Sequence, residues 1–239
     1  MHTQLALESR RRSPATLPGF RKGQRPVNYG RKFPGEVYEP EEVLALLDAI
    51  PATTAGTRDR ALFVTLWRTG MRISEALNLR ELDLHESTGY VRIRRGRKNE
   101  RGRDVMMFGS GDSPTFGWDQ LHPWLIKRAE LDVLKSAPLF CTFSGPSQGG
   151  KLKDAQMRNT LHRYVQRAGL HGRFHLHGFR HTLAAELYRG DVKLTRIKHQ
   201  LGHSSLAVTQ TYLEDVLGIP EAMDELSQYQ PTWRLSSSS

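Results

Sequence analysis

The chain has 239 residues, of which 38% are hydrophobic and 25% charged, and its formal net charge at pH 7 is +10. It contains no apolar run long enough to span a bilayer and no apolar segment of the secretory-signal type near its start. The single cysteine, Cys141, excludes an intrachain disulfide and a cysteine-based zinc site, and it favours a reducing compartment such as the cytoplasm.

Most of the positive charge lies in residues 1–35, where eight basic residues accompany a single acid, Glu8. This segment is rich in Arg, Pro, Gly and Ser and has no periodic apolar positions, which predicts an extended arm. Such segments bind nucleic-acid phosphates and can become ordered on DNA, although a solvated tail is the alternative. The predicted DNA-binding residues are Arg10, Arg11, Arg12, Arg21, Lys22, Arg25, Arg31 and Lys32.

Two helices are predicted directly after the arm. Pro40 suits the first turn of a helix whose apolar face repeats at helical spacing, and Pro51 ends it. Thr57 is expected to cap a second helix over residues 58–68, and Gly70 is expected to terminate it.

A short helix is then predicted from Ser74, followed by a turn over residues 81–84. Residues 89–95 alternate in polarity and predict a strand, with residues 104–108 as its hairpin partner. Further helices are expected over 118–134, 154–168, 178–189, 193–201, 205–213 and, optionally, 220–228. The predicted fold is therefore mainly α with a small antiparallel β-sheet.

The C-terminal third carries four side chains in a fixed order: His177, Arg180 three residues later, His203 and Tyr212 nine residues after that. Guanidinium groups stay charged and bind phosphate through a rigid fork, and preorganised donors stabilise the charge that develops in phosphoryl transfer. The histidines can donate hydrogen bonds or move protons, and the phenol can act as a nucleophile if it is activated. These residue types therefore suit cleavage of a phosphodiester without a metal.

Each residue also has a simpler interpretation. Arg72 could be a surface arginine paired with Glu75 at a spacing of three, and Tyr212 could pack a helix face. His175, His177 and His181 could suggest a metal, but a His-x-His pattern without cysteines or nearby acids is weak evidence for one.

Five segments taken together resemble the tyrosine recombinase, or phage integrase, family. They are TGMRISEALNLRELDL (69–84), the hairpin segment RGRKNERGRDVMM, HGFRH (177–181), LGHSS (201–205) and TYL (211–213). They occur in the family's order and spacing and span about residues 40–215. The resemblance implies the catalytic-domain fold of this family, a double-stranded DNA substrate and no cofactor or metal.

The same resemblance implies a role for each matching residue. Arg72 and Arg180 would bind the scissile phosphate, His177 and His203 would assist with hydrogen bonds and proton transfer, and Glu75 would orient the site. Lys98 would protonate the leaving 5′-oxygen, although Arg95 or Arg97 could lie nearer the DNA. Tyr212 would form a 3′-phosphotyrosyl bond with the cleaved strand. The 5′-hydroxyl of a second strand would then displace Tyr212 and complete the exchange. In site-specific recombination this chemistry is carried out by four protomers on two duplexes.

Three functions remain open on the sequence. The first is a site-specific recombinase of integration, excision or resolution type in a prokaryotic or phage-infected cell. The others are DNA relaxation of the type IB topoisomerase kind and a DNA-binding accessory protein that lacks strand exchange. We expect a basic arm over 1–35 in place of the family's N-terminal DNA-binding domain, a catalytic domain over 36–215, and a tail over 216–239 that docks on a neighbouring protomer or on its own domain.

Overall fold

The computed structural model describes residues 36–94, 102–109 and 113–217. The predicted arm, the hairpin turn that carries Lys98 and the optional last helix lie outside the described residues. The described helices and strands are α2 (Pro40–Asp48), α3 (Thr54–Thr69), α4 (Ile73–Ala76), β1 (Leu84–His85), β2 (Tyr90–Ile93), β3 (Arg103–Met106), α5 (Phe116–Glu130), α6 (Asp154–Arg167), α7 (Gly178–Arg189), α8 (Leu194–Leu201) and α9 (Leu206–Leu217).

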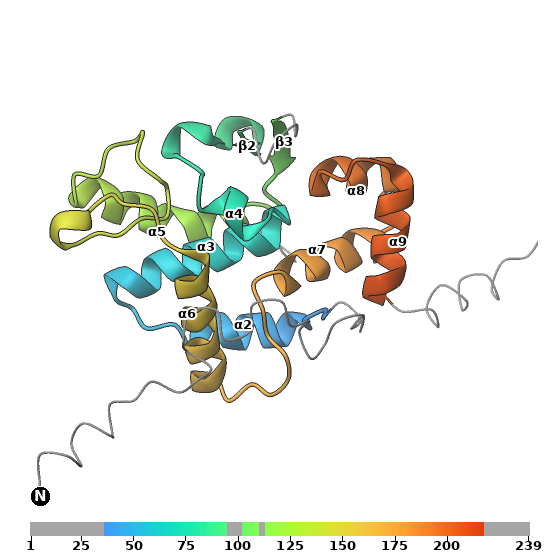
Figure 1. Ribbon diagram of the computed structural model, residues 1–239, viewed down its shortest axis with the longest axis horizontal. Helices are drawn as coiled ribbons and strands as arrows, with labels where there is room; N and C mark the ends of the chain where they lie inside the picture. Colours follow the sequence, from blue (N-terminus) through green and yellow to red (C-terminus); the bar gives the residue numbers. More distant parts are fainter. Residues whose placement is uncertain (1–35, 95–101, 110–112, 218–239) are drawn as a thin grey trace, which may run out of the picture. The chain divides into compact units, whose positions relative to one another are not determined.

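Helix α3 is the central element of the helical core and packs against both α5 and α7 (Figure 1). Twelve of its 16 residues are buried, which is typical of a helix covered on most sides. Phe63 of α3 stacks on Phe179 of α7, with 5.7 Å between the ring centroids. This contact fixes α7, which carries Arg180, against the centre of the domain.

The three strands form an antiparallel sheet in the order β1-β2-β3, in which Val91 pairs with both Leu84 and Val105. Gln200 of α8 closes the outer edge of β3, because its side-chain amide accepts from Met106 N at 3.0 Å and donates to Met106 O at 2.9 Å. The prediction of a mainly α fold with a small antiparallel sheet is confirmed. Within the described residues, no helix is long and apolar enough to cross a bilayer.

Helix α3 begins earlier than predicted. Thr53, rather than Thr57, is the N-cap, and its hydroxyl accepts a hydrogen bond from Gly56 N at 3.1 Å. Thr57 lies inside the first turn, where its hydroxyl donates to Thr53 O. Both threonines precede apolar helical positions, so the residue pattern alone did not separate them.

Two further boundaries differ from the predictions. Helix α5 runs from Phe116 to Glu130 and stops before the expected residue 134, because Asp132 turns the chain with a φ of 52°. The expected turn over 81–84 is a 3₁₀ turn that leads directly into strand β1. The alternation signal missed this strand because it is only two residues long.

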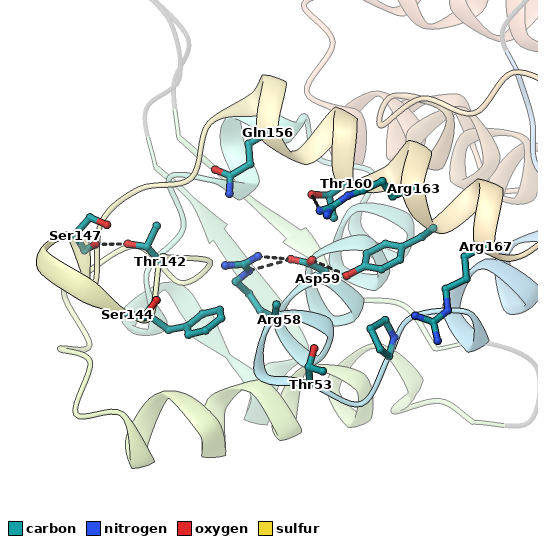
Figure 2. Close-up of a pocket in the computed structure, with 14 residues that line it drawn as sticks. Thr53, Arg58, Asp59, Thr142, Ser144, Ser147, Gln156, Thr160, Arg163 and Arg167 are labelled. Atoms are coloured by element: carbon teal, nitrogen blue, oxygen red, sulfur yellow. Dashed lines mark hydrogen bonds and ion pairs between the residues drawn. The ribbon is translucent and has the colours of Figure 1, made fainter.

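A buried ion pair near the start of α3 binds a tyrosine of α6 beside a cavity of about 630 Å³ (Figure 2). Arg58 donates to Asp59 Oδ1 through Nε at 2.9 Å and Nη2 at 2.7 Å, and Tyr164 of α6 donates to Asp59 Oδ2 at 3.0 Å. Burial raises the pKa of Asp59, although the charge of Arg58 opposes the shift. The buried carboxylate of Asp59 is therefore stabilised by hydrogen bonds from Arg58 and Tyr164.

Replacing Asp59 should therefore weaken the fold more than replacing an exposed acid. Asp59→Ala leaves the Arg58 guanidinium buried without its counter-charge, and we expect a loss of about 3–5 kcal/mol in the free energy of unfolding. Urea denaturation followed by circular dichroism measures this loss. The matched control is Asp48→Ala, whose exposed carboxylate lies 3.8 Å from Arg60 and should contribute less than about 1 kcal/mol. Equal losses in the two variants would contradict the assignment.

Candidate active site

Tyr38, near the first described residue, holds the segment that leads into α7 through two hydrogen bonds. The Tyr38 hydroxyl donates to His175 O at 2.6 Å and accepts from His175 N at 2.7 Å. A Cβ atom on Gly178 would lie 1.9 Å from the same hydroxyl, so only glycine fits there. His177, which immediately precedes α7, is therefore positioned by a glycine and by a distant tyrosine.

Arg180 projects from α7 and is 2% exposed. Its Nη1 donates to Gly70 O, at the end of α3, at 2.7 Å, and its Nη2 lies 2.9 Å from His203 Nε2. Because a guanidinium can only donate, His203 Nε2 accepts this bond and the proton of the neutral ring lies on Nδ1. That Nδ1 donates to Thr209 Oγ1 of α9 at 3.1 Å, so a chain of hydrogen bonds runs from α7 to α9.

Tyr212 lies on α9 among the same groups. Its ring stacks on His181, with 5.2 Å between centroids and 16° between planes, and meets His203 edge-on at 4.9 Å. The guanidinium carbon of Arg180 lies 5.9 Å from the ring centroid. Leu213, the next residue, anchors α9 in a small apolar cluster shared with α7 and α8. Packing thus brings Tyr212 beside Arg180 and His203.

Arg72 and Glu75 occupy the start of α4, where Arg72 is the N-cap. Glu75 accepts from Arg72 N at 2.7 Å and from Arg72 Nη1 at 3.2 Å. It also accepts two bonds from Arg103 of β3, at 2.8 and 3.1 Å. Burial favours a higher pKa for Glu75, but the bonds and charges of Arg103 and Arg72 outweigh it and lower the pKa. Glu75 is therefore an ionised bridge between α4 and the sheet.

Arg103 is a residue of this site that the sequence analysis missed. Besides Glu75, it donates to Leu201 O at 3.3 Å, and its guanidinium packs on Gly202. A Cβ atom on Gly202 would lie 2.5 Å from that guanidinium, and Gly202 has a φ of +70°. Arg103 thus joins two of the motif segments. The sequence offered one clue to Arg103, which is its place at the start of the second hairpin strand, directly before Asp104.

Burial controls protonation at this site. It raises the pKa of Tyr212 to about 12, against the opposing effect of Arg180, so the phenol is neutral at physiological pH. It lowers the pKa of His203 to about 4, and the nearby arginines add to the shift. The pKa of His177 is lowered as well, by partial removal of solvent and then by Arg180, although this side chain keeps an exposed surface. The resting site therefore holds neutral rings among charged arginines.

The structure brings the six described site residues together. They lie at α4 and the start of α7, in the connection between α8 and α9, and in the middle of α9: Arg72, Glu75, His177, Arg180, His203 and Tyr212. Lys98 and the basic residues of the arm lie outside the described residues. Among the described side chains, no group of three or more His, Cys, Asp or Glu residues is arranged to hold a metal ion. The arrangement can bind an anion at the arginines and present a phenol to it.

Comparisons with known proteins agree on one family. The model of the phage integrase family matches residues 36–216. The tyrosine recombinase XerD of Corynebacterium glutamicum is 34% identical over 78% of this chain and 59% of its own length. The tyrosine recombinase XerC of Oceanobacillus iheyensis is 34% identical over 76% of this chain and 57% of its own length. The chain thus spans less than two thirds of the length of each relative.

Solved structures share the fold. The XerA recombinase superposes with a TM-score of 0.67, at 22% identity, over 91% of this chain and 70% of its own. The XerH site-specific recombinase, in a post-cleavage complex with its difH substrate, gives a TM-score of 0.65 at 26% identity over 86% of this chain and 56% of its own. Because the family model covers most of the chain and the motif residues converge in one place, this protein belongs to the phage integrase family of tyrosine recombinases.

Proposed function

We propose that this chain is a site-specific DNA recombinase that cleaves and rejoins DNA through a 3′-phosphotyrosyl intermediate. The observation that carries the proposal is the placement of Tyr212 of α9 beside Arg180 of α7 and His203, which lies between α8 and α9. The relatives named XerC and XerD, and the XerH complex captured after cleavage, support it. A single buried cysteine suits the reducing cytoplasm of a prokaryotic or phage-infected cell.

The proposed reaction begins when the scissile phosphate binds Arg72 and Arg180. The phosphate accepts N–H groups of Arg180, which releases His203 Nε2 from its present bond, and once this nitrogen takes up a proton it can donate to the phosphate instead. The Tyr212 oxygen then attacks phosphorus and gives its proton to a basic group such as His177. The bond from phosphorus to the 5′-oxygen breaks, and the 5′-oxygen takes a proton, for which we propose Lys98 as the donor.

Strand exchange follows from the reversibility of this step. The covalent bond conserves the energy of the phosphodiester, so a 5′-hydroxyl of a second strand can displace Tyr212 without a nucleotide cofactor. Such exchange needs four protomers on two duplexes, and lambda integrase, which shares the fold at 15% identity, was crystallised as a tetramer on a Holliday junction. We propose the same assembly here, with residues 216–239 as the segment that docks on a neighbouring protomer.

Trapping the covalent adduct tests the proposal. The protein is incubated with a nicked suicide duplex of its target site, and the products are separated on a denaturing gel. We expect a DNA-linked species whose modified peptide, identified by mass spectrometry, contains Tyr212. Adduct formation and plasmid relaxation without exchanged products would favour a topoisomerase-like activity. DNA binding without an adduct on any substrate would favour an accessory role.

We further propose that the arm over residues 1–35 holds DNA through its phosphates. Deleting residues 2–35 removes eight cations, so we expect weaker DNA binding and a flatter dependence of log Kd on log salt concentration. Fluorescence anisotropy at a series of salt concentrations measures both quantities. The control replaces the eight basic residues with glutamine at constant length and should give the same result. An unchanged salt slope in both proteins would contradict the proposal.

A further inference from the structure

His181 has no role among those proposed above, yet it makes a direct ring contact with the nucleophile. It follows Arg180 on α7 and stacks on Tyr212 with nearly parallel rings. The rings of His177 and His175 lie at close to right angles to the His181 ring, with 4.8 and 5.9 Å between centroids. Three histidines of one segment thus form a cluster of rings, of which His181 stacks on Tyr212.

This arrangement leaves Nδ1 of His181 buried without a hydrogen bond to any described residue. The Tyr212 hydroxyl is buried as well, and the Arg180 side chain interacts with it and opposes the rise in its pKa. Burying a polar atom without a partner is unfavourable, so the stacking contact with Tyr212 must offset this cost. The observation that points to a role in placing Tyr212 is this direct ring contact.

His181 is unsuited to act as the base in this closed arrangement. Burial, with added repulsion from His177 and His175, lowers its pKa to about 3, whereas the pKa of Tyr212 is raised to about 12. Because the two rings are nearly parallel, the nitrogen lone pairs of His181 also lie in the plane of its own ring and do not point at the phenol. The ring can act only through its position and its lack of charge.

We propose that His181 is a positioning residue for strand cleavage, whose neutral ring holds the Tyr212 phenol against the arginine-lined phosphate site. The inference rests on the proposed function, because it concerns the same nucleophile. A misplacement of about 1 Å at a reacting group can cost roughly a hundredfold in rate. The flat face of the ring, rather than its nitrogen atoms, is the part of His181 that the reaction uses.

The test compares His181→Ala, which removes the ring, with His181→Phe, which keeps an aromatic face. We expect His181→Ala to lower the rate constant of adduct formation at saturating DNA by roughly 10- to 100-fold, with Kd for DNA nearly unchanged. His181→Phe should recover the rate to within about fivefold of the wild type, because the stacked geometry persists. The control, His122→Ala, removes a histidine that pairs with Glu86 on the surface, and it should match the wild type.

A second readout does not depend on catalysis. Nitration of Tyr212 by tetranitromethane, followed by peptide mass spectrometry, should be faster in His181→Ala than in the wild type and in His181→Phe. An equal loss of cleavage in both variants would overturn the proposal in favour of a role for the imidazole nitrogens. Wild-type cleavage and nitration rates in His181→Ala would also overturn it. If the wild type forms no adduct, the proposed function fails, and nitration still decides whether His181 holds Tyr212.

Discussion

Tyr212→Phe is expected to abolish the covalent protein–DNA adduct completely, because the substitution removes the oxygen atom that would bond to phosphorus. The change should leave the fold intact. The lost hydroxyl interacts with the Arg180 side chain, and removing it should change the free energy of unfolding by about 1 kcal/mol at most. The ring itself remains available to stack on His181 and to pack beside Leu213.

Three measurements separate loss of chemistry from loss of structure in Tyr212→Phe. Adduct formation on a suicide substrate should be undetectable, whereas the thermal midpoint and Kd for DNA should match those of the wild type. Tyr164→Phe is the matched control, because its hydroxyl donates to Asp59 far from this site. That control should lose stability and retain cleavage. A persistent adduct in Tyr212→Phe would mean that another residue is the nucleophile.

Substitutions of Arg180 should have the next largest effect on cleavage. Arg180→Ala removes a preorganised donor to the developing charge, for which we expect a loss of roughly 10²- to 10³-fold in the rate of adduct formation. It also leaves Gly70 O without its buried donor, which costs about 1–3 kcal/mol of stability. Arg180→Lys restores the charge without the fork that serves Gly70 and His203 together, so we expect it to recover only part of the rate.

Arg68→Ala is the control for the structural part of this effect. Arg68 is also a buried arginine of the domain, but its Nη1 pairs with Glu186 at 2.8 Å and it takes no part in the proposed chemistry. Its removal should lower the midpoint of urea denaturation and leave the rate of adduct formation unchanged for the folded protein. A similar loss of rate in both arginine variants would show that Arg180 acts mainly through the fold.

The sequence predicted the helices and the small sheet of this domain well, because those signals are local. Periodic apolar positions, Gly70 and Pro51 mark helices that the structure contains, and ordered spacing identified Arg180 and Tyr212 as a pair. What it did not predict depends on contacts between distant residues. The bonds from Arg103 to Glu75 and the stacking of His181 on Tyr212 require the hairpin, α7 and α9 to be placed first. A residue pattern along the chain carries no such information.

The two hydrogen bonds between Tyr38 and the backbone of His175 have a mechanical consequence. Tyr38 N also donates to Thr182 Oγ1 of α7 at 2.8 Å. Tyr38 therefore makes hydrogen bonds to the chain both before and after Arg180, at His175 and at Thr182. A pull on the polypeptide before Tyr38 would act on the segment that carries His177 through these bonds and through the packing of the Tyr38 ring on Phe174 and Phe179. Tyr38 therefore couples tension on the N-terminal side of the domain to the position of His177 and Arg180.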